Sequence, residues 1–157
     1  MADQIISQEY LHKIFNYKDG ELFRISTQTQ AGKRIDNDGY RRTWFNGKQH
    51  RTHRLIFAYH YGFLPKFIDH IDGDKTNNCI ENLRNATISQ NNQNAKIRKD
   101  NTSGSKNVYW EKRSKSWVVR ITANKQEIHI GKYKNINDAI LSAQKARNKY
   151  HGQFAKG

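Results

Sequence analysis

Cysteine is nearly absent from the 157-residue sequence, in which Cys79 is the only thiol. One thiol cannot form a disulfide within the chain and cannot build a zinc site from thiolates, so no structural zinc is expected. Long apolar runs are also missing, because a histidine, a proline and a lysine interrupt the longest one, LIFAYHYGFLPKFI. The start, MADQIISQEYLHK, lacks the charged-then-apolar pattern of a signal peptide. We therefore expect a soluble protein of a reducing compartment with no membrane partner.

Acidic residues are also scarce. There are 14 Asp and Glu against 28 Lys and Arg, which gives a formal net charge of +14 and a pI near 10.0. Such an excess is typical of a protein that neutralises phosphates and releases their counterions. The alternative is a solvated basic surface without a partner. The apolar fraction is only 35%, but aromatic residues make up 11%, which favours two small cores over one large core.

The first 98 residues carry signals for several short elements. Asn46-Gly47 predicts a two-residue hairpin turn, because both positions must tolerate positive φ. Thr52 and Ser89 are expected to cap helices, and Gly62 is expected to end the first of these. The predicted helices cover about residues 7–15, 53–61 and 89–97, and the predicted strands cover 22–25, 39–45, 48–51, 67–71 and 83–87.

The composition changes in KDNTSGSK, residues 99–106. This stretch contains no apolar side chain and is predicted to be a flexible linker. Beyond it, the pattern indicates three strands and an amphipathic helix with a narrow alanine stripe. The strands are expected near residues 107–111, 116–123 and 126–133, and the helix over 137–150. The sequence thus predicts an α+β chain with domains at 1–98 and 107–157, the second a three-stranded antiparallel sheet packed on one helix.

The segment IDHIDGDKTNNCIENLRNATISQNNQN, residues 68–94, contains three aspartates, seven asparagines and one histidine. Hydrolysis of a phosphodiester needs a base, a cation on the phosphate and stabilisation of the leaving oxygen. His70 suits the base, because the ordinary pKa of imidazole lies near working pH. Asp69 and an amide oxygen of Asn91 are hard ligands of the kind that Mg²⁺ prefers.

These residues carry a resemblance to a known family. DHIDGDKTNNCIENLRNATISQN, with THRLIFAYHYG upstream, resembles the HNH homing-type endonucleases, the His-metal-finger nucleases of phages and group I introns. The resemblance covers about residues 39–97, with a core motif at 67–97, and implies a ββα-metal finger. It implies His70 as general base, Asp69 and Asn91 as ligands of one divalent ion, and Asn82 as the residue that holds the loop around the histidine. Mg²⁺ is the expected ion, with Mn²⁺ as the alternative.

Other polar residues of the segment have simpler interpretations. Asn77 and Asn78 are expected to form turns, since asparagine tolerates left-handed backbone. Asp72 is expected to shape the same turn, with an outer-sphere metal role as the alternative. His53 bonds a phosphate, supports the site or packs in the core, and Arg84 either contacts a phosphate or is a solvated strand residue. Because neighbours on a strand point to opposite faces, Asp69 and His70 can share a site only where the strand ends.

The C-terminal pattern has its own resemblance. NVYWEKRSKSWVVRI, then HIGKY and an A-x-x-A helix, resemble the APETALA-type, ethylene-response DNA-binding domain over about residues 105–153. That resemblance implies a sheet that reads a DNA groove. Trp117 is assigned to the core, and charged turn residues either contact phosphates or only aid solubility. The predicted DNA contacts are Tyr109, Lys112, Arg113, Arg120, Thr122 and His129, together with Arg84.

Together these features predict a metal-dependent DNA endonuclease that hydrolyses phosphodiester bonds in double-stranded DNA. A homing-type enzyme of phage origin is expected, acting in the cytoplasm of a bacterial host as a monomer that nicks or a homodimer that cuts both strands. The first alternative is a regulatory DNA-binding protein with a non-catalytic HNH fold. The second is an RNA-binding protein.

Overall fold

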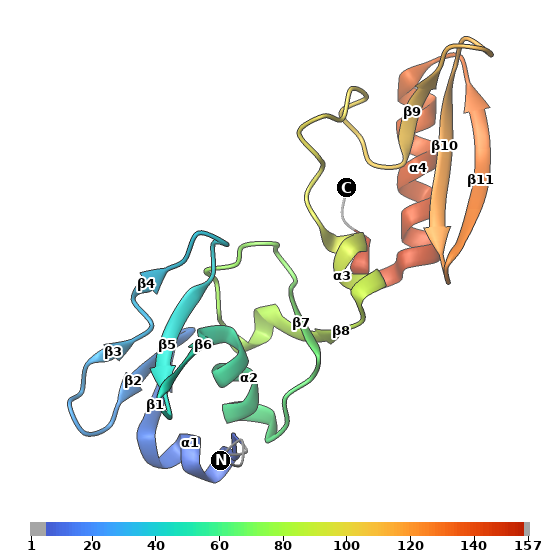
Figure 1. Cartoon of the computed structure of the whole chain (residues 1–157). Coiled ribbons are helices and arrows are strands. Elements are labelled where there is room, and N and C mark those ends of the chain that lie inside the picture. Colours follow the sequence, from blue (N-terminus) through green and yellow to red (C-terminus); the bar gives the residue numbers. More distant parts are fainter. Residues whose placement is uncertain (1–5, 156–157) are drawn as a thin grey trace. The chain divides into compact units, whose positions relative to one another are not determined.

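A computed structural model describes residues 6–155 (Figure 1). The chain is a mixed α/β protein with small antiparallel sheets, and it divides after Asn91 into two compact units. Residues 92–106, including the predicted linker at 99–106, group with the C-terminal unit.

The N-terminal unit begins with α1 (Gln8–Ile14), whose first turn is capped by the Ser7 hydroxyl. Next come β1 (Phe15–Lys18), β2 (Glu21–Arg24) and the two-residue β3 (Gln30–Ala31), which form one sheet in that order. Neither β1 nor β3 was predicted, because β1 begins at Phe15, where the predicted helix ends, and β3 is only two residues long.

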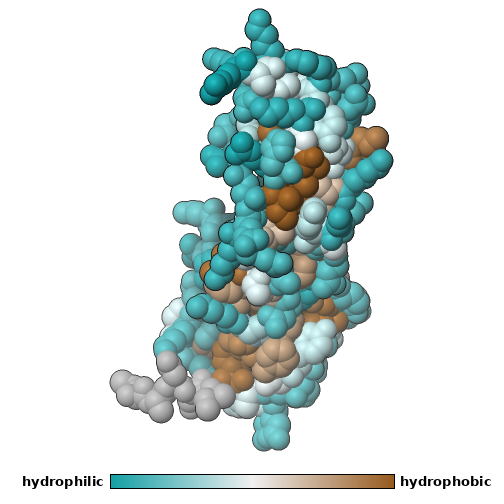
Figure 2. Space-filling view, turned by 90° about the vertical axis from the view of Figure 1, so that its right-hand side faces the viewer, coloured by the Kyte–Doolittle hydropathy of each residue, from teal (hydrophilic) through white to brown (hydrophobic). Residues whose placement is uncertain are grey.

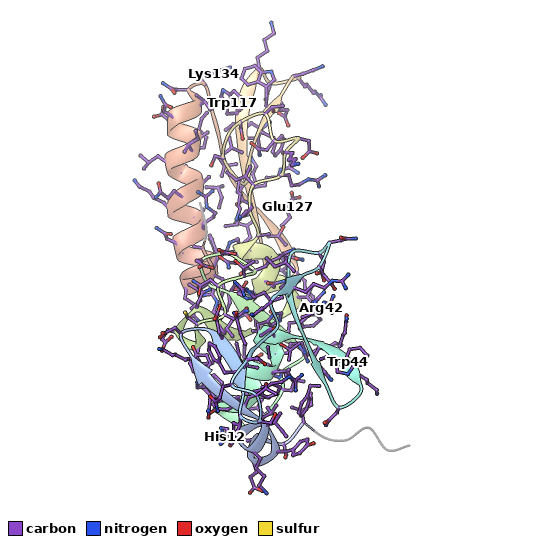
Figure 3. The ribbon with its side chains drawn as sticks, turned by 90° about the vertical axis from the view of Figure 1, so that its left-hand side faces the viewer. His12, Arg42, Trp44, Trp117, Glu127 and Lys134 are labelled. Carbon is purple, nitrogen blue, oxygen red and sulfur yellow. The ribbon has the colours of Figure 1, made fainter. Side chains whose placement is uncertain are left out.

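A second sheet consists of β4 (Arg34–Ile35), β5 (Arg41–Phe45) and β6 (Lys48–Arg51). The predicted Asn46-Gly47 turn joins the last two strands, with φ values of 48° and 70°. In β5, Thr43 and Phe45 are buried, whereas Trp44 is 57% exposed and projects outward in Figure 3.

The helix α2 (Thr52–Tyr61) packs beneath this sheet. The prediction that Thr52 caps it is wrong, because Arg51 occupies the cap position and no side chain accepts a hydrogen bond there. The buried Thr52 hydroxyl instead lies 2.9 Å from that of Thr43 and ties the helix to β5. Gly62 ends the helix with a φ of 73°, as the sequence predicts.

The core of this unit gathers side chains from α1, α2 and several strands. Burial of these residues supplies the main stabilisation of so small a unit. Its buried members are Leu11, Phe15, Leu22, Ala31, Phe45, Leu55, Ile56, Phe57, Ala58, Ile68 and Leu83.

The unusual polar segment forms β7 (Phe67–His70), a loop with the 3₁₀ turn η1 (Ile80–Asn82), β8 (Leu83–Ala86) and α3 (Ile88–Asn94). This is the predicted order of strand, loop, strand and helix (Figure 1).

The start of α3 differs from the prediction. Thr87 accepts a hydrogen bond from the Gln90 amide at 3.2 Å, and the Gln90 side chain accepts one from the Thr87 amide at 2.8 Å. This reciprocal pair is a capping box, so Thr87 rather than Ser89 starts the helix.

The C-terminal unit contains β9 (Val108–Glu111), β10 (Ser116–Ala123) and β11 (Gln126–Tyr133), in the order β11-β10-β9. The helix α4 (Ile136–His151) packs on the sheet, followed by the short η2 (Gly152–Phe154). The predicted sheet on one helix is present. Val108, Val119, Ala139 and Ala143 are its buried centre, and Trp117 packs against them.

Residues 101–106 are held by hydrogen bonds rather than extended. Ser103 and Ser105 are buried, and the Ser103 hydroxyl donates to the Val108 carbonyl at 2.8 Å. The buried Arg147 of α4 donates to the Lys106 carbonyl, also at 2.8 Å. This part of the predicted linker is therefore folded onto the C-terminal unit.

Hydrophilic residues predominate on the face shown in Figure 2, where apolar residues form small separate patches. Among the helices within residues 6–155, none has both the length and the apolar character needed to cross a membrane.

Candidate active site

His70 is the last residue of β7 and is only 4% exposed. Its carbonyl accepts a hydrogen bond from the Gly73 amide at 2.9 Å, which closes a turn directly after the strand. Its ring nitrogen Nε2 lies 3.1 Å from Oδ1 of Asn78, and this partner is itself 2% exposed. The histidine is therefore both buried and held by a side-chain hydrogen bond.

The surroundings of His70 favour a neutral ring. Burial lowers the pKa of the imidazole below its ordinary value and outweighs the hydrogen bond to Asn78 and the nearby Asp72, Asp69 and Asp74 carboxylates, which raise it. A neutral imidazole at physiological pH can accept a proton, as a general base must.

Two aromatic rings pack against this imidazole. The ring of His53 is T-shaped to that of His70, with centroids 4.9 Å apart, and Tyr40 lies 5.9 Å from His70 and 5.0 Å from His53. His53 is 3% exposed, and burial, followed by repulsion from His70 and three arginines, lowers its pKa to about 3. His53 is thus a neutral packing partner of His70.

Two cationic side chains lie over the ring of Tyr40. The Arg51 guanidinium lies 4.3 Å from the ring centroid, and the Lys75 ammonium lies 4.8 Å from it. Lys75 donates to the Asp38 carbonyl at 2.8 Å, and Arg51 pairs with the Asp38 carboxylate at 2.9 Å. Two cations are therefore fixed around an aromatic ring that packs on His70.

Asp69, the neighbour of His70 on β7, is also buried, at 4% exposure. Arg84 lies opposite it on β8 and donates from Nε to its Oδ2 at 2.8 Å, while Nη2 lies 2.7 Å from the same oxygen in an ion pair. The Arg84 side chain is only 14% exposed, so it is not a solvated strand residue. Its predicted phosphate contact stays a prediction.

Asn82 crosses the loop between the two strands. Its Oδ1 accepts from the Asp72 amide at 3.0 Å, and its Nδ2 donates to Asp72 Oδ1 at 3.0 Å and to the Asn77 carbonyl at 2.8 Å. Asn77 in turn donates to Asp72 Oδ2 at 2.7 Å. These hydrogen bonds hold the turn that follows His70. Burial raises the pKa of Asp72, but the hydrogen bond from the Asp74 amide, those from Asn77 and Asn82, and attraction to His70 outweigh it, so the pKa is lowered.

Asn91 lies in α3 and is exposed, with its backbone amide donating to the Thr87 carbonyl at 3.0 Å. The carboxylate of Asp69 and the amide of Asn91 are hard oxygen donors, so their chemistry fits Mg²⁺ or Mn²⁺ rather than zinc. No group of three or more His, Cys, Asp or Glu that could hold a metal occurs within residues 6–155. A two-ligand site would therefore need water and phosphate as further ligands, and the pairing of Asp69 with Asn91 stays a prediction.

In the C-terminal unit, strand register places the predicted DNA contacts on one face. Arg120 pairs with His129, Thr122 with Glu127, and Val118 with Tyr109, and this face is opposite the α4 core. Arg120 donates to Glu127 at 3.3 Å and lies 5.8 Å from the Tyr109 ring centroid. The turn residues Lys112 and Arg113 are exposed.

The sequence analysis missed two features of the site. The first is Asn78, which was assigned to a turn because asparagine tolerates positive φ, although Asn78 does not adopt a positive φ. The second is Tyr40, which packs on His70 together with His53, a residue that the sequence predicted to support the site or to pack in the core. A buried amide eight residues after a histidine has no sequence signature of its own, and Tyr40 reads as an ordinary strand residue.

Comparison with known proteins bears on this site. Residues 50–93, which include His70, Asn82 and Asn91, match a family model described as HNH endonuclease. The chain is also similar to the solved structure described as DNA binding and cleavage by the HNH homing endonuclease I-HmuI, with 33% identity and a TM-score of 0.43. That match covers 51% of this chain and 50% of that one, so the chain spans about half the length of that protein.

A curated relative covers more of the sequence. The chain is 34% identical over 111 residues to Protein 3.8 of Escherichia phage T7, a match that takes in 69% of this chain and 91% of the relative. With the family-model match lying across the buried histidine and the loop that holds it, the chain belongs to the HNH endonuclease family.

Proposed function

We propose that this chain is a metal-dependent DNA endonuclease of the phage homing type that hydrolyses phosphodiester bonds. The observation that carries the proposal is the buried, hydrogen-bonded His70 beside the buried Asp69, inside the segment that matches the HNH endonuclease model. The phage relative supports the assignment to a phage enzyme.

His70 takes the proton from the attacking water. Its low exposure and lowered pKa keep the ring neutral, and the turn to Gly73 fixes its backbone. Asn82 acts through that turn, since its hydrogen bonds to Asp72 and Asn77 keep the loop closed around the imidazole.

Asp69 and Asn91 are the residues that would hold one divalent ion, Mg²⁺ or Mn²⁺. When bound, such an ion would act as a Lewis acid toward the scissile phosphate and the leaving oxygen. Arg84 orients the Asp69 carboxylate, because its hydrogen bond from Nε and its ion-pair contact from Nη2 both reach the same oxygen.

The positive net charge of the chain supports double-stranded DNA as the substrate. In the C-terminal unit, similar in sequence to the APETALA-type domain, Tyr109, Arg120, Thr122 and His129 face the groove. Lys112 and Arg113, with Arg84 in the nuclease unit, contact phosphates. One active site per chain nicks DNA as a monomer or cuts both strands as a homodimer.

A regulatory DNA-binding protein with a non-catalytic HNH fold is the second candidate. The ion pair of Arg84 with Asp69 favours it, because a guanidinium already neutralises the carboxylate that would bind the metal. The enzyme is favoured by the presence of all four motif residues, Asp69, His70, Asn82 and Asn91.

Incubation of supercoiled plasmid with the full chain distinguishes the enzyme from the binding protein. The enzyme converts the plasmid to nicked or linear DNA with Mg²⁺ or Mn²⁺ and leaves it intact with EDTA. Retarded but uncut plasmid under all three conditions would support the binding protein. Sequencing the ends of any product would then report the strand polarity and the site.

A further inference from the structure

The amide of Asn78 faces one particular nitrogen of the buried histidine. Oδ1 of Asn78 lies 3.1 Å from Nε2 of His70, and the two side chains are 2% and 4% exposed. An amide oxygen only accepts hydrogen bonds, so the nitrogen that faces it carries the proton. A neutral imidazole has a single ring proton, and with that proton on Nε2 the lone pair lies on Nδ1.

We propose that Asn78 is a positioning residue that fixes the Nε2–H tautomer of His70 and thereby makes Nδ1 the nitrogen that accepts the proton from water. The proposal rests on the endonuclease function proposed above. It also replaces the prediction that Asn78 is present only to form a turn.

The position of Asn78 is fixed on both sides along the chain. Before it, the Asn77 carbonyl accepts from Asn82 and the Asn77 side chain donates to Asp72. After it, the Cys79 amide donates to Asn77 Oδ1 at 3.3 Å, and the Ile80 amide donates to the hydroxyl of Tyr17 at 3.0 Å. The amide of Asn78 is therefore presented by a loop with little freedom to move.

A close backbone contact holds the same loop from the other side. A Cβ atom at Gly20 would lie 2.8 Å from the Cys79 nitrogen and 3.1 Å from the Asn78 carbonyl carbon. Gly20 also has a φ of 80°, which side-chain-bearing residues rarely adopt. The Asp19-Gly20 turn therefore lets the backbone of residues 78 and 79 approach closely.

The imidazole is restrained as well. His53 meets it edge to face at 4.9 Å, and Tyr40 packs at 5.9 Å. These rings limit rotation of the His70 side chain, while Asn78 determines which ring nitrogen bears the proton. Packing and hydrogen bonding thus fix the orientation and the tautomer separately.

Nitrogen-15 NMR of the histidine side chains in the full chain tests the proposal directly, because protonated and unprotonated ring nitrogens have distinct shifts. The measurement is made without metal at mildly alkaline pH, where the ring is neutral, and the spectrum of His70→Gln assigns the signals. We expect a protonated Nε2 in the wild type. A protonated Nδ1 would overturn the proposal whether or not the protein cleaves DNA.

Two substitutions of similar size separate the acceptor from the packing. Asn78→Asp keeps an oxygen acceptor and should retain the Nε2–H tautomer, whereas Asn78→Leu removes it and should give a mixture of both tautomers. Asn85→Leu, the same change at an exposed position of β8, is the control and should leave the ring signals unchanged. An Asn78→Leu spectrum identical to that of the wild type would contradict the proposal.

Cleavage kinetics give a second readout. For Asn78→Leu we expect kcat to fall by about tenfold or more with KM for DNA unchanged, and for Asn78→Asp we expect kcat to be largely rescued. Equal loss in both variants would contradict a role through the acceptor. If the wild type itself proves inactive, the proposed function fails, and the tautomer is still measured independently.

Discussion

Across the β7–β8 pair, Arg84 donates a hydrogen bond from Nε to Oδ2 of Asp69 at 2.8 Å, and its Nη2 forms an ion pair with the same oxygen at 2.7 Å. The two side chains are 14% and 5% exposed, so this is the buried ion pair of the candidate site. Charge-assisted hydrogen bonds of this kind fix the orientation of the carboxylate that is proposed to hold the metal.

Removal of Arg84 should therefore destabilise the protein. We expect Arg84→Met to lower the free energy of unfolding by about 3 kcal/mol, because a buried carboxylate loses its partner. Arg98→Met is the control, since the ion pair of Arg98 with Asp100 is highly exposed and should contribute about 1 kcal/mol or less. Urea denaturation measures both, and equal small effects would show that Asp69 does not depend on Arg84.

The proposed ligand Asn91 can be tested through the metal. We expect Asn91→Ala to raise the Mg²⁺ concentration for half-maximal cleavage by about tenfold and to lower the rate, because one of two protein ligands is lost. Asn92→Ala, at the neighbouring asparagine, which is also exposed, should leave the titration unchanged. Superimposable curves for wild type and Asn91→Ala would remove Asn91 from the site.

Acid should destabilise the nuclease unit through His53. Its pKa is about 3 in the folded chain, against an ordinary value of 6.5, so between these values the unfolded state binds a proton that the native state does not. Stability is therefore lost as pH falls below about 6.5, by roughly 2 kcal/mol at about pH 5 from this one group.

The non-titrating variant His53→Gln isolates that contribution. Its free energy of unfolding, measured by urea at about pH 7.5 and about pH 5, should fall less between the two than that of the wild type. His129→Gln, at an exposed imidazole, serves as the control and should keep the wild-type dependence. An unchanged pH dependence in His53→Gln would mean that the buried ring is not the group responsible.

Salt dependence tests the phosphate contacts proposed for the C-terminal unit. Lys112→Ala and Arg113→Ala should each lower the slope of log affinity against log salt concentration by about 1, because each releases one counterion fewer. Lys145→Ala, at an exposed position of α4, removes the same charge and should leave the slope unchanged. Equal effects at all three positions would indicate attraction by net charge alone.

Much of the fold was predictable where local signals are strong. The Asn46-Gly47 turn, the Gly62 end of α2 and all three strands of the C-terminal sheet lie where the pattern predicts them. The two-residue strands β3 and β4 were missed, because their pairing partners rather than their own residues determine them.

The candidate site, like the fold, was predictable only in part. His70, Asp69 and Asn82 were recognisable because their spacing is kept within one continuous segment. The role of Asn78 depends on a loop pinned by Tyr17 and Gly20, which lie about sixty residues earlier in the sequence. Likewise, the hydroxyl of Thr52 serves β5 instead of capping its own helix, because Thr43 approaches it in the folded chain.

The most direct measurement compares cleavage and binding in His70→Ala. With plasmid and Mg²⁺, we expect its cleavage rate to fall by about a hundredfold or more, while its affinity for duplex DNA in a gel-shift titration stays that of the wild type. His12→Ala, at an exposed imidazole of α1, should cleave normally. Cleavage by His70→Ala at the wild-type rate would contradict the role of the buried histidine as the base.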